Sequence, residues 1–305
     1  MVEKKILILA STSFIGKNIK KYFENKYTIF SIDRGDVDFK NGELLKSVIE
    51  KIDPEIIINC CGIVGSSVKN KNFNDFDILN ENIILNTNIL NSCRTLNIKK
   101  IILFSSYRLF GDDIHQNYNE DDIYKSNIKF NIGYLTSKKV LDSQIKLFTK
   151  EYKIDIVCLI MTNIFGCYDD FSINSRIVPS MITNIKKHYS ENSDAIIKSN
   201  KNTLVNLVFV DDISRIIETC FLNDEIKGNI IVFNKNTTIT LENLTDKISN
   251  LLDYKNNIIF DNNNEIIYNT NIMKPDLSRF EYFFNNFEFT DLDKSLKITI
   301  DFFNS

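Results

Sequence analysis

The segment Lys5-Ile-Leu-Ile-Leu-Ala-Ser-Thr-Ser-Phe-Ile-Gly16 decides the fold. Its first five residues form a nearly continuous apolar run, which is typical of a parallel strand covered on both faces. A polar turn follows, and the pattern from there to Phe23 predicts a helix. The pyrophosphate of a dinucleotide binds where such a strand and turn lead into a helix N-terminus. The segment therefore predicts the first unit of a doubly wound sheet.

The same alternation of strands and helices continues through the first half of the chain. Strands are predicted at residues 27–33, 56–59, 100–106 and 154–160, helices at 44–52, 78–96 and 134–152, and a polar excursion at 120–130. Helices of about ten or more residues between strands favour an α/β protein with a doubly wound parallel sheet. Ligands are expected beyond the carboxyl ends of the strands.

The alternation ends after Gly166. We expect a loop, a helix that opens near Pro179, a strand at 203–210, a helix at 211–221, a short strand at 230–233, and helices at 241–252 and 291–303, with Thr240 as an N-cap. We expect residues 1–168 and 205–234 to form a dinucleotide-binding domain. Residues 169–204 and 235–305 would form a smaller α/β substrate-binding cap.

Composition excludes several classes of function. The 305 residues are 43% hydrophobic and 25% charged, with a net charge of −3 and no basic block, so we expect no nucleic-acid partner. The apolar run near the start is too short for a signal peptide or a membrane span. Six cysteines without C-x-x-C spacing and only two histidines, His115 and His188, predict no metal site and no disulfide framework. A reduced cytoplasm is the expected location.

Tyr134 and Lys138 are the first candidates for chemistry. Their i, i+4 spacing places both side chains on one face of the predicted helix. A neighbouring ammonium favours the phenolate and lowers the pKa of a tyrosine, which makes the phenol a useful proton donor. The alternative is a core aromatic residue followed by a solvated lysine.

Several further motifs occur in a characteristic order. They are Asn59-Cys-Cys-Gly-Ile-Val-Gly65, Asn82-Ile-Ile-Leu-Asn-Thr-Asn-Ile-Leu90, Ser105-Ser-Tyr-Arg-Leu-Phe-Gly111, Thr162-Asn-Ile-Phe-Gly166, Val210-Asp-Asp212 and Lys274-Pro-Asp276. With the glycine-loop position and the Tyr134/Lys138 pair, the chain resembles the extended short-chain dehydrogenases/reductases over nearly its whole length. That family comprises nucleotide-sugar epimerases, dehydratases and reductases with a Rossmann-type sheet and a cap.

Within the family, the resemblance is strongest to the GDP-L-fucose synthase branch. It rests on Met161-Thr-Asn-Ile-Phe-Gly-Cys-Tyr-Asp-Asp-Phe171, on Ser175-Arg-Ile-Val-Pro179 and on Gly62-Ile-Val-Gly65. The resemblance implies that Tyr134 protonates a carbonyl oxygen as hydride arrives, that Lys138 holds the nicotinamide ribose, and that Ser106 bonds the same oxygen. The alternative for Ser106 is a strand-end hydroxyl that caps its own turn.

The cofactor implied by the resemblance is NADP(H) in preference to NAD. Asp33, at the end of the second predicted strand, suits the adenosine ribose hydroxyls, whereas Arg34 suits a 2′-phosphate, so the residues leave the choice open. The expected cofactor-binding residues are Ser11, Ser13, Phe14, Ile15, Gly16, Asp33, Arg34, Asp36, Val37, Cys60, Cys61, Gly62, Asn82, Tyr134, Lys138, Met161, Asn163 and Ile164.

The chain departs from the family at the glycine loop and in the cap. The Gly-x-x-Gly-x-x-Gly pattern is here Ala10, Ser13 and Gly16, which predicts weaker or displaced cofactor binding, although Ser13 can donate to a phosphate. Val205 replaces an arginine of many relatives. Lys201 or Arg279 would substitute for it, unless both are solvated charges. The expected substrate-binding residues are Val64, Tyr107, Arg108, Asn163, Arg176, Val178, Lys201 and Arg279.

Two departures narrow the implied reaction. Tyr107 and Arg108 replace the Asp-Glu pair of sugar 4,6-dehydratases, which disfavours dehydration. Arg108 and Arg176 replace the cysteine and histidine that epimerise in fucose synthases, and arginine is a poor proton shuttle. We therefore expect NAD(P)H-dependent reduction of the 4-keto group of a GDP-linked deoxysugar or heptose for surface polysaccharide. The alternatives are a 4-epimerase with tightly bound NAD and a non-catalytic dinucleotide-binding protein. A homodimer through the helices at 78–96 and 135–152 is the family habit.

Overall fold

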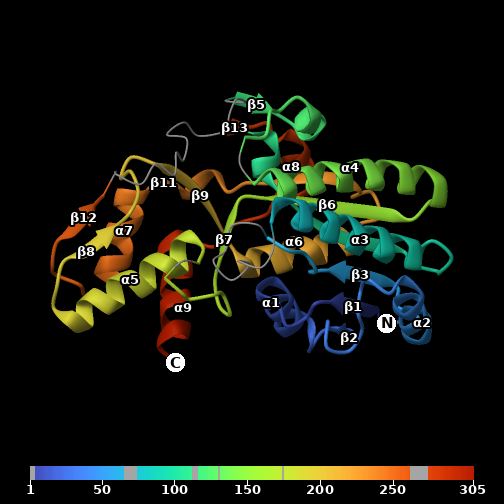
Figure 1. Ribbon diagram of the computed structural model, residues 1–305, viewed down its shortest axis with the longest axis horizontal. Helices are drawn as coiled ribbons and strands as arrows, with labels where there is room; N and C mark the ends of the chain where they lie inside the picture. The colour runs from blue at the N-terminus through green and yellow to red at the C-terminus, as the bar shows by residue number, and fades with distance from the viewer. Residues whose placement is uncertain (1–3, 65–73, 112–115, 130, 174, 262–273) are drawn as a thin grey trace.

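The computed structural model describes residues 4–64, 74–111, 116–129, 131–173, 175–261 and 274–305 (Figure 1). Its central sheet has six parallel strands in the order β10-β6-β4-β3-β1-β2. These strands are β1 (Lys5–Leu9), β2 (Thr28–Ile32), β3 (Ile56–Asn59), β4 (Lys100–Ser106), β6 (Asp155–Met161) and β10 (Gly228–Val232). Strand β2 lies on one side of β1, whereas β3, β4, β6 and β10 lie on the other, so the chain changes direction across the sheet at β1. The predicted doubly wound parallel sheet is therefore confirmed.

Helices cover both faces of this sheet (Figure 1). They are α1 (Phe14–Phe23) and α6 (Val210–Leu222) on one face, and α2 (Gly42–Ile52), α3 (Asp75–Cys93) and α4 (Ile132–Tyr152) on the other. Along β1, Ile6 and Ile8 join the core of the first face, whereas Leu7 and Leu9 join the core of the second. A strand buried on both faces needs apolar residues at every position, which explains the continuous run in the sequence.

The rest of the chain builds smaller units beside the sheet (Figure 1). One has β7 (Asn163–Phe165), β9 (Leu204–Phe209) and β11 (Thr238–Thr240) in the order β11-β9-β7. Another pairs β8 (Ala195–Ile197) with β12 (Ile258–Phe260), beside α5 (Ile177–Glu191), α7 (Leu241–Leu251) and α9 (Leu292–Asn304). A third pairs β5 (Gln116–Tyr118) with β13 (Lys274–Pro275), near α8 (Ser278–Phe283).

Most predicted elements lie close to their predicted positions, but α3 and β9 differ. The helix predicted at 78–96 runs from Asp75 to Cys93, because Asn74 caps it and Asp77 completes a capping box. The strand predicted at 203–210 is β9, which leaves the central sheet and pairs with β7 and β11. Thr240 caps α7, as predicted. The division of the chain into two domains stays a prediction.

No helix within the described ranges combines the length and the apolar character needed to cross a membrane. Within the same ranges, no group of three or more His, Cys, Asp or Glu side chains is arranged to hold a metal ion. All six cysteines are free thiols.

Candidate active site

The loop between β1 and α1 contains no glycine, and the one glycine kept from the three-glycine pattern, Gly16, lies in the first turn of α1. Ala10 adopts the left-handed conformation, at φ 56°. A Cβ on Gly16 would lie 2.4 Å from the Ala10 carbonyl oxygen, so only glycine fits there. Ser13 caps α1 by accepting a hydrogen bond from Gly16 N at 3.1 Å. With no acidic residue in its first turn, the α1 N-terminus attracts anions.

Asp33, in the turn after β2, holds this loop. Its carboxylate accepts hydrogen bonds from the Ser11 hydroxyl at 2.7 Å, and from the Thr12 backbone N–H and hydroxyl at 2.8 and 2.7 Å. Burial acts to raise the pKa of Asp33, yet the hydrogen bonds from Ser11 and Thr12 lower it below its usual value. A carboxylate has about four lone-pair positions that can accept hydrogen bonds, and Ser11 and Thr12 use three of those on Asp33. Asp36 accepts from the Asp33 N–H at 2.9 Å and shapes the same turn.

The segment after β3 forms the next wall of the site. The Cys60 N–H donates to the Leu9 carbonyl oxygen at 3.0 Å, which aligns the ends of β3 and β1. The buried Asn82 on α3 both donates to and accepts from the Ile63 backbone, at 2.9 Å each, and so holds the segment that contains Gly62.

Beside this segment, the Arg34 guanidinium contacts the Cys61 sulfur at 3.7 Å. The structure thus brings Arg34, Cys61, Gly62 and Asn82 to the edge where the loop lies. Val64, the next residue along, is exposed.

Ser106 and Met161 are paired neighbours at the carboxyl ends of β4 and β6. The Ser106 hydroxyl oxygen accepts a hydrogen bond from the Arg108 N–H at 3.4 Å and caps the single 3₁₀ turn Tyr107–Phe110. The capping role that the sequence left open is therefore present. It uses only a lone pair, so the hydroxyl proton is still able to bond a substrate oxygen. Tyr107 and Arg108 are half-buried at the same edge.

Helix α4 brings Tyr134 and Lys138 over β4. The buried Lys138 ammonium donates to the Phe104 carbonyl oxygen at 2.9 Å and lies 5.5 Å from the centroid of the Tyr134 ring. At Gly133, a Cβ would lie 1.8 Å from the Asp75 carbonyl oxygen, so the start of α4 touches the start of α3. The lysine is not a solvated surface charge, and the pair shares one helix face at the end of β4.

The remaining predicted residues divide into those near this edge and those in hydrophobic cores. Asn163 and Ile164 follow Met161 in β7, and the Asn163 amide donates to the Asn206 carbonyl oxygen at 3.0 Å. Val37 and Val178 lie in the two large cores, so their side chains serve packing.

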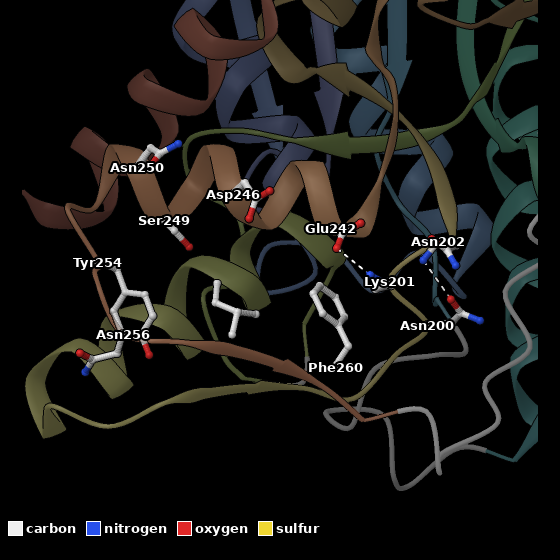
Figure 2. Close-up of a pocket in the computed structure, with 11 residues that line it drawn as sticks. Asn200, Lys201, Asn202, Glu242, Asp246, Ser249, Asn250, Tyr254, Asn256 and Phe260 are labelled. Atoms are coloured by element: carbon white, nitrogen blue, oxygen red, sulfur yellow. Dashed lines mark hydrogen bonds and ion pairs between the residues drawn. The ribbon is translucent and has the colours of Figure 1, made fainter.

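Two predicted substrate residues are engaged elsewhere. Arg279 donates to the carbonyl oxygens of Lys227, which precedes β10, and of Asn229 near its start. These lie at the amino end of β10, whereas Ser106 lies at the carboxyl end of β4. Lys201 pairs with Glu242 at 2.9 Å. Figure 2 shows Lys201 and Glu242 on the wall of a cavity of about 820 Å³ between α7 and β12. The structure does not bring Arg279 to the edge that carries Ser106 and Tyr134.

Sequence reasoning missed three residues that shape the site. Thr12 bonds Asp33, as described above. The buried Asn18 on α1 donates to the carbonyl oxygens of Phe14 and Cys167, at 2.8 and 2.7 Å. Asp169 forms an ion pair with Arg176 at 2.6 Å. Asp169 stands inside the quoted Cys-Tyr-Asp-Asp-Phe motif, but its partner lies seven residues on, and only the fold reveals the pairing.

The parallel sheet, the anion-attracting α1 N-terminus and the Ser-Tyr-Lys set at one edge together define a dinucleotide-binding protein of the Rossmann type. The chain belongs to the NAD dependent epimerase/dehydratase family, whose model matches residues 6–233.

Individual relatives are distant in sequence and similar in structure. GDP-L-fucose synthase of Dictyostelium discoideum is 24% identical over 220 residues, which span 70% of this chain and 68% of that protein. The structure of a GDP-L-fucose synthetase from Naegleria fowleri bound to NADP has a TM-score of 0.90 at 20% identity, covering 100% of this chain and 93% of that one. A GDP-mannoheptose C4 reductase from Campylobacter jejuni with NADP bound has a TM-score of 0.87 at 13% identity, covering 100% and 99%. At such identities the structures establish the shared fold.

Proposed function

We propose that the protein reduces the 4-keto group of a nucleotide-activated sugar with NAD(P)H. The carrying observation is the placement of Lys138 against the Phe104 carbonyl oxygen beneath Tyr134, next to Ser106 at the end of β4. A GDP-linked deoxysugar or heptose is the proposed substrate, because the curated relative and both solved structures carry GDP-sugars in their names. The proposed setting is surface polysaccharide biosynthesis in the cytoplasm.

Each residue of the set has one task in this reaction. The chemistry that a bound NAD(P)H would add is a hydride for the carbonyl carbon at C4. The Tyr134 phenol gives its proton to the carbonyl oxygen, so that a ketone becomes an alcohol. The Lys138 ammonium stabilises the phenolate that forms, and the Ser106 hydroxyl donates a hydrogen bond to the oxygen as charge develops. The phenol regains a proton from solvent before the next turnover.

NADPH is the proposed cofactor. The Asp33 carboxylate is already occupied by Ser11 and Thr12, which leaves it little capacity for ribose hydroxyls. Arg34 follows it directly and presents a guanidinium, the side chain best suited to a 2′-phosphate. The two solved structures named above also contain NADP. In this proposal, Asp33 stabilises the loop by hydrogen bonds, and Arg34 binds the 2′-phosphate of NADPH.

We also propose that the protein is a homodimer through α3 and α4. The two helices pack against each other on one face of the sheet, and their outer sides carry Phe76, Leu147 and Tyr152 with exposed fractions of 71%, 64% and 43%. Large apolar side chains exposed on adjacent helices favour burial against a second copy. Sedimentation equilibrium with Leu147→Glu, which introduces a charge at this surface, tests the proposal.

The function is tested by combining a thermal-shift screen with an assay of NADPH oxidation. A ligand at about 100 times its Kd stabilises a protein by about 2.7 kcal/mol, and a weaker ligand at the same concentration stabilises it less. If the protein prefers GDP-sugars, they should therefore raise the Tm more than CDP-, dTDP- or UDP-sugars do. NADPH absorbance should then fall when a 4-keto GDP-sugar is added. Tightly retained NAD without net NADPH consumption would identify a 4-epimerase instead. Binding without any turnover on all four nucleotide classes would favour a non-catalytic protein.

A further inference from the structure

We propose that Arg176 is a cofactor-binding residue that reaches from the residue before α5 to the diphosphate of the dinucleotide. The inference rests on the dinucleotide part of the proposed function, and it assigns Arg176 to the cofactor instead of the sugar. Three features support it: the two-point contact of the guanidinium with Asp169, its contact with the Phe14 ring, and its N–H donors that make no hydrogen bond to Asp169.

The guanidinium of Arg176 is held along one edge by a buried carboxylate. Its Nη2 lies 2.6 Å from Asp169 Oδ1, and its Nε donates to Oδ2 at 3.3 Å. The Asp169 side chain has no exposed surface, whereas that of Arg176 is 44% exposed. A two-point contact of this kind orients the planar group and leaves its opposite edge directed away from the carboxylate.

The face of the same guanidinium lies on the first residue of α1. Its Cζ is 4.7 Å from the centroid of the Phe14 ring. Phe14 follows Ser13, the N-cap of α1. Asn18 ties the Phe14 carbonyl oxygen to that of Cys167, so the segment leading to Asp169 is joined to α1 a second time. The positive charge of Arg176 is therefore held at the helix end where a dinucleotide diphosphate binds in this fold.

Arg176 retains hydrogen-bonding capacity for a ligand. A guanidinium has five N–H donors, and the two contacts to Asp169 use two of them. The other three have no hydrogen-bond partner among the residues that the structure describes. A planar donor set beside a partly exposed surface suits phosphate oxygens better than carbon-bound hydroxyls, because bonds between two charged groups are stronger.

The chain also has a reason to need this cation. Close approach of the backbone to a diphosphate normally depends on glycines in the loop, and here Ala10 and Ser13 occupy two of the three positions. A guanidinium supplied from the cap would restore the affinity lost at the loop. It would also bring the cap against the dinucleotide, since Arg176 immediately precedes α5.

The test is calorimetric titration of Arg176→Gln with two fragments of NADPH. One is 2′-phospho-ADP-ribose, which contains the diphosphate, and the other is 2′-AMP, which lacks it. We expect the variant to bind NADPH and 2′-phospho-ADP-ribose about tenfold more weakly, or about 1.4 kcal/mol, and 2′-AMP almost unchanged. Arg176→Lys keeps the charge without the fork, and an intermediate loss is expected.

Arg215→Gln is the matched control. Arg215 pairs with the buried Asp212 at 2.6 Å and lies 4.6 Å from the Phe287 ring centroid, but it also donates to Glu288 and faces the C-terminal segment instead of α1. Its loss should lower the Tm without changing the binding ratio of the two fragments.

Four results would overturn the inference. Equal weakening of both fragments by Arg176→Gln would mean that the variant distorts the loop as a whole. Unchanged NADPH binding with weaker binding of GDP would make Arg176 a substrate residue. If the unaltered protein binds neither NADPH nor NADH, the proposed function itself fails along with the inference, whereas normal wild-type binding with an unaffected variant removes only the inference.

Discussion

The carbonyl oxygen of Ala10 occupies the space that a side chain on Gly16 would need. A Cβ at Gly16 would lie 2.4 Å from that oxygen and 2.8 Å from the Cα of Ser11. Both are backbone atoms, so neither can yield without moving the loop away from α1. The first turn of α1 is in this way packed directly on the loop that it follows.

Gly16→Ala should therefore destabilise the protein by roughly 1–3 kcal/mol, the usual cost of overpacking, and weaken NADPH binding. Chemical denaturation and calorimetric titration measure the two effects. Gly35→Ala is the control, because a Cβ there meets nothing within 4 Å and should be nearly neutral for stability. An unchanged free energy of unfolding for Gly16→Ala would contradict the close approach.

Tyr134→Phe should leave folding and cofactor binding intact and remove turnover, because it deletes only the proton donor. Lys138→Met should lower both affinity and rate, since its ammonium bonds Phe104 and lies beside the phenol. Tyr189→Phe, at an exposed tyrosine on α5, serves as the control. Near wild-type turnover by Tyr134→Phe would show that another group is the acid.

Arg34→Ala should weaken NADPH much more than NADH if the guanidinium binds the 2′-phosphate. Asp33→Asn should weaken both alike, because it loosens the loop through Ser11 and Thr12. Titration of both variants with both cofactors gives four affinities to compare. A loss confined to NADH in Asp33→Asn would restore the ribose-binding role that the sequence suggested.

The stability difference between the wild type and Asp33→Asn should depend on pH. The pKa of Asp33 is lower in the folded protein than its usual value of about 3.9. Its contribution is therefore fully present above that value, and it is lost as the pH falls through the lowered folded pKa. Urea unfolding of both proteins should give a constant difference near neutral pH and a shrinking one below about pH 4. A difference that changes between pH 6 and 8 would implicate another group.

Reduction should proceed without proton exchange at C3 or C5 of the sugar. The resemblance to fucose synthases assigns Arg108 and Arg176 to the positions of the two epimerising residues, and a guanidinium that stays charged can hardly remove a carbon-bound proton. Turnover in heavy water followed by NMR of the product measures the exchange. Enzyme-dependent deuterium at C3 or C5 on the timescale of turnover would show that another residue has taken the epimerase role, with Tyr107 the first suspect.

The long apolar strands could be predicted because their burial is a local property. Lys5–Leu9, Ile56–Asn59 and Lys100–Ser106 have the bounds predicted from the sequence. The short strands β7, β8 and β12 could not, since three residues carry too little pattern and their pairing partners lie far along the chain. The same reason explains β9, whose sequence gave no sign of which sheet it would join.

Site residues divide along similar lines. The helical spacing of Tyr134 and Lys138, and the motif order that carries the family resemblance, were enough to expect these two residues and Ser106 in one site. The positions of single charged residues were harder to predict, because a charged side chain pairs with whichever group the fold brings near it. Arg279 meets the carbonyl oxygens of Lys227 and Asn229 at the far edge, and nothing in its own neighbourhood of sequence predicts that.

The hydrogen bonds between Asp33 and the loop have a consequence for the thermodynamics of binding. A loop of glycines is mobile until its ligand arrives, and ordering it then opposes association. Here the stretch from Ala10 to Ser13 contains no glycine and is held by Asp33 in the free protein. The conformational entropy of this loop is therefore lost when the chain folds and not when the ligand binds. The dinucleotide consequently meets a surface that is already formed, and its association should carry an unusually small entropic penalty for so long a ligand.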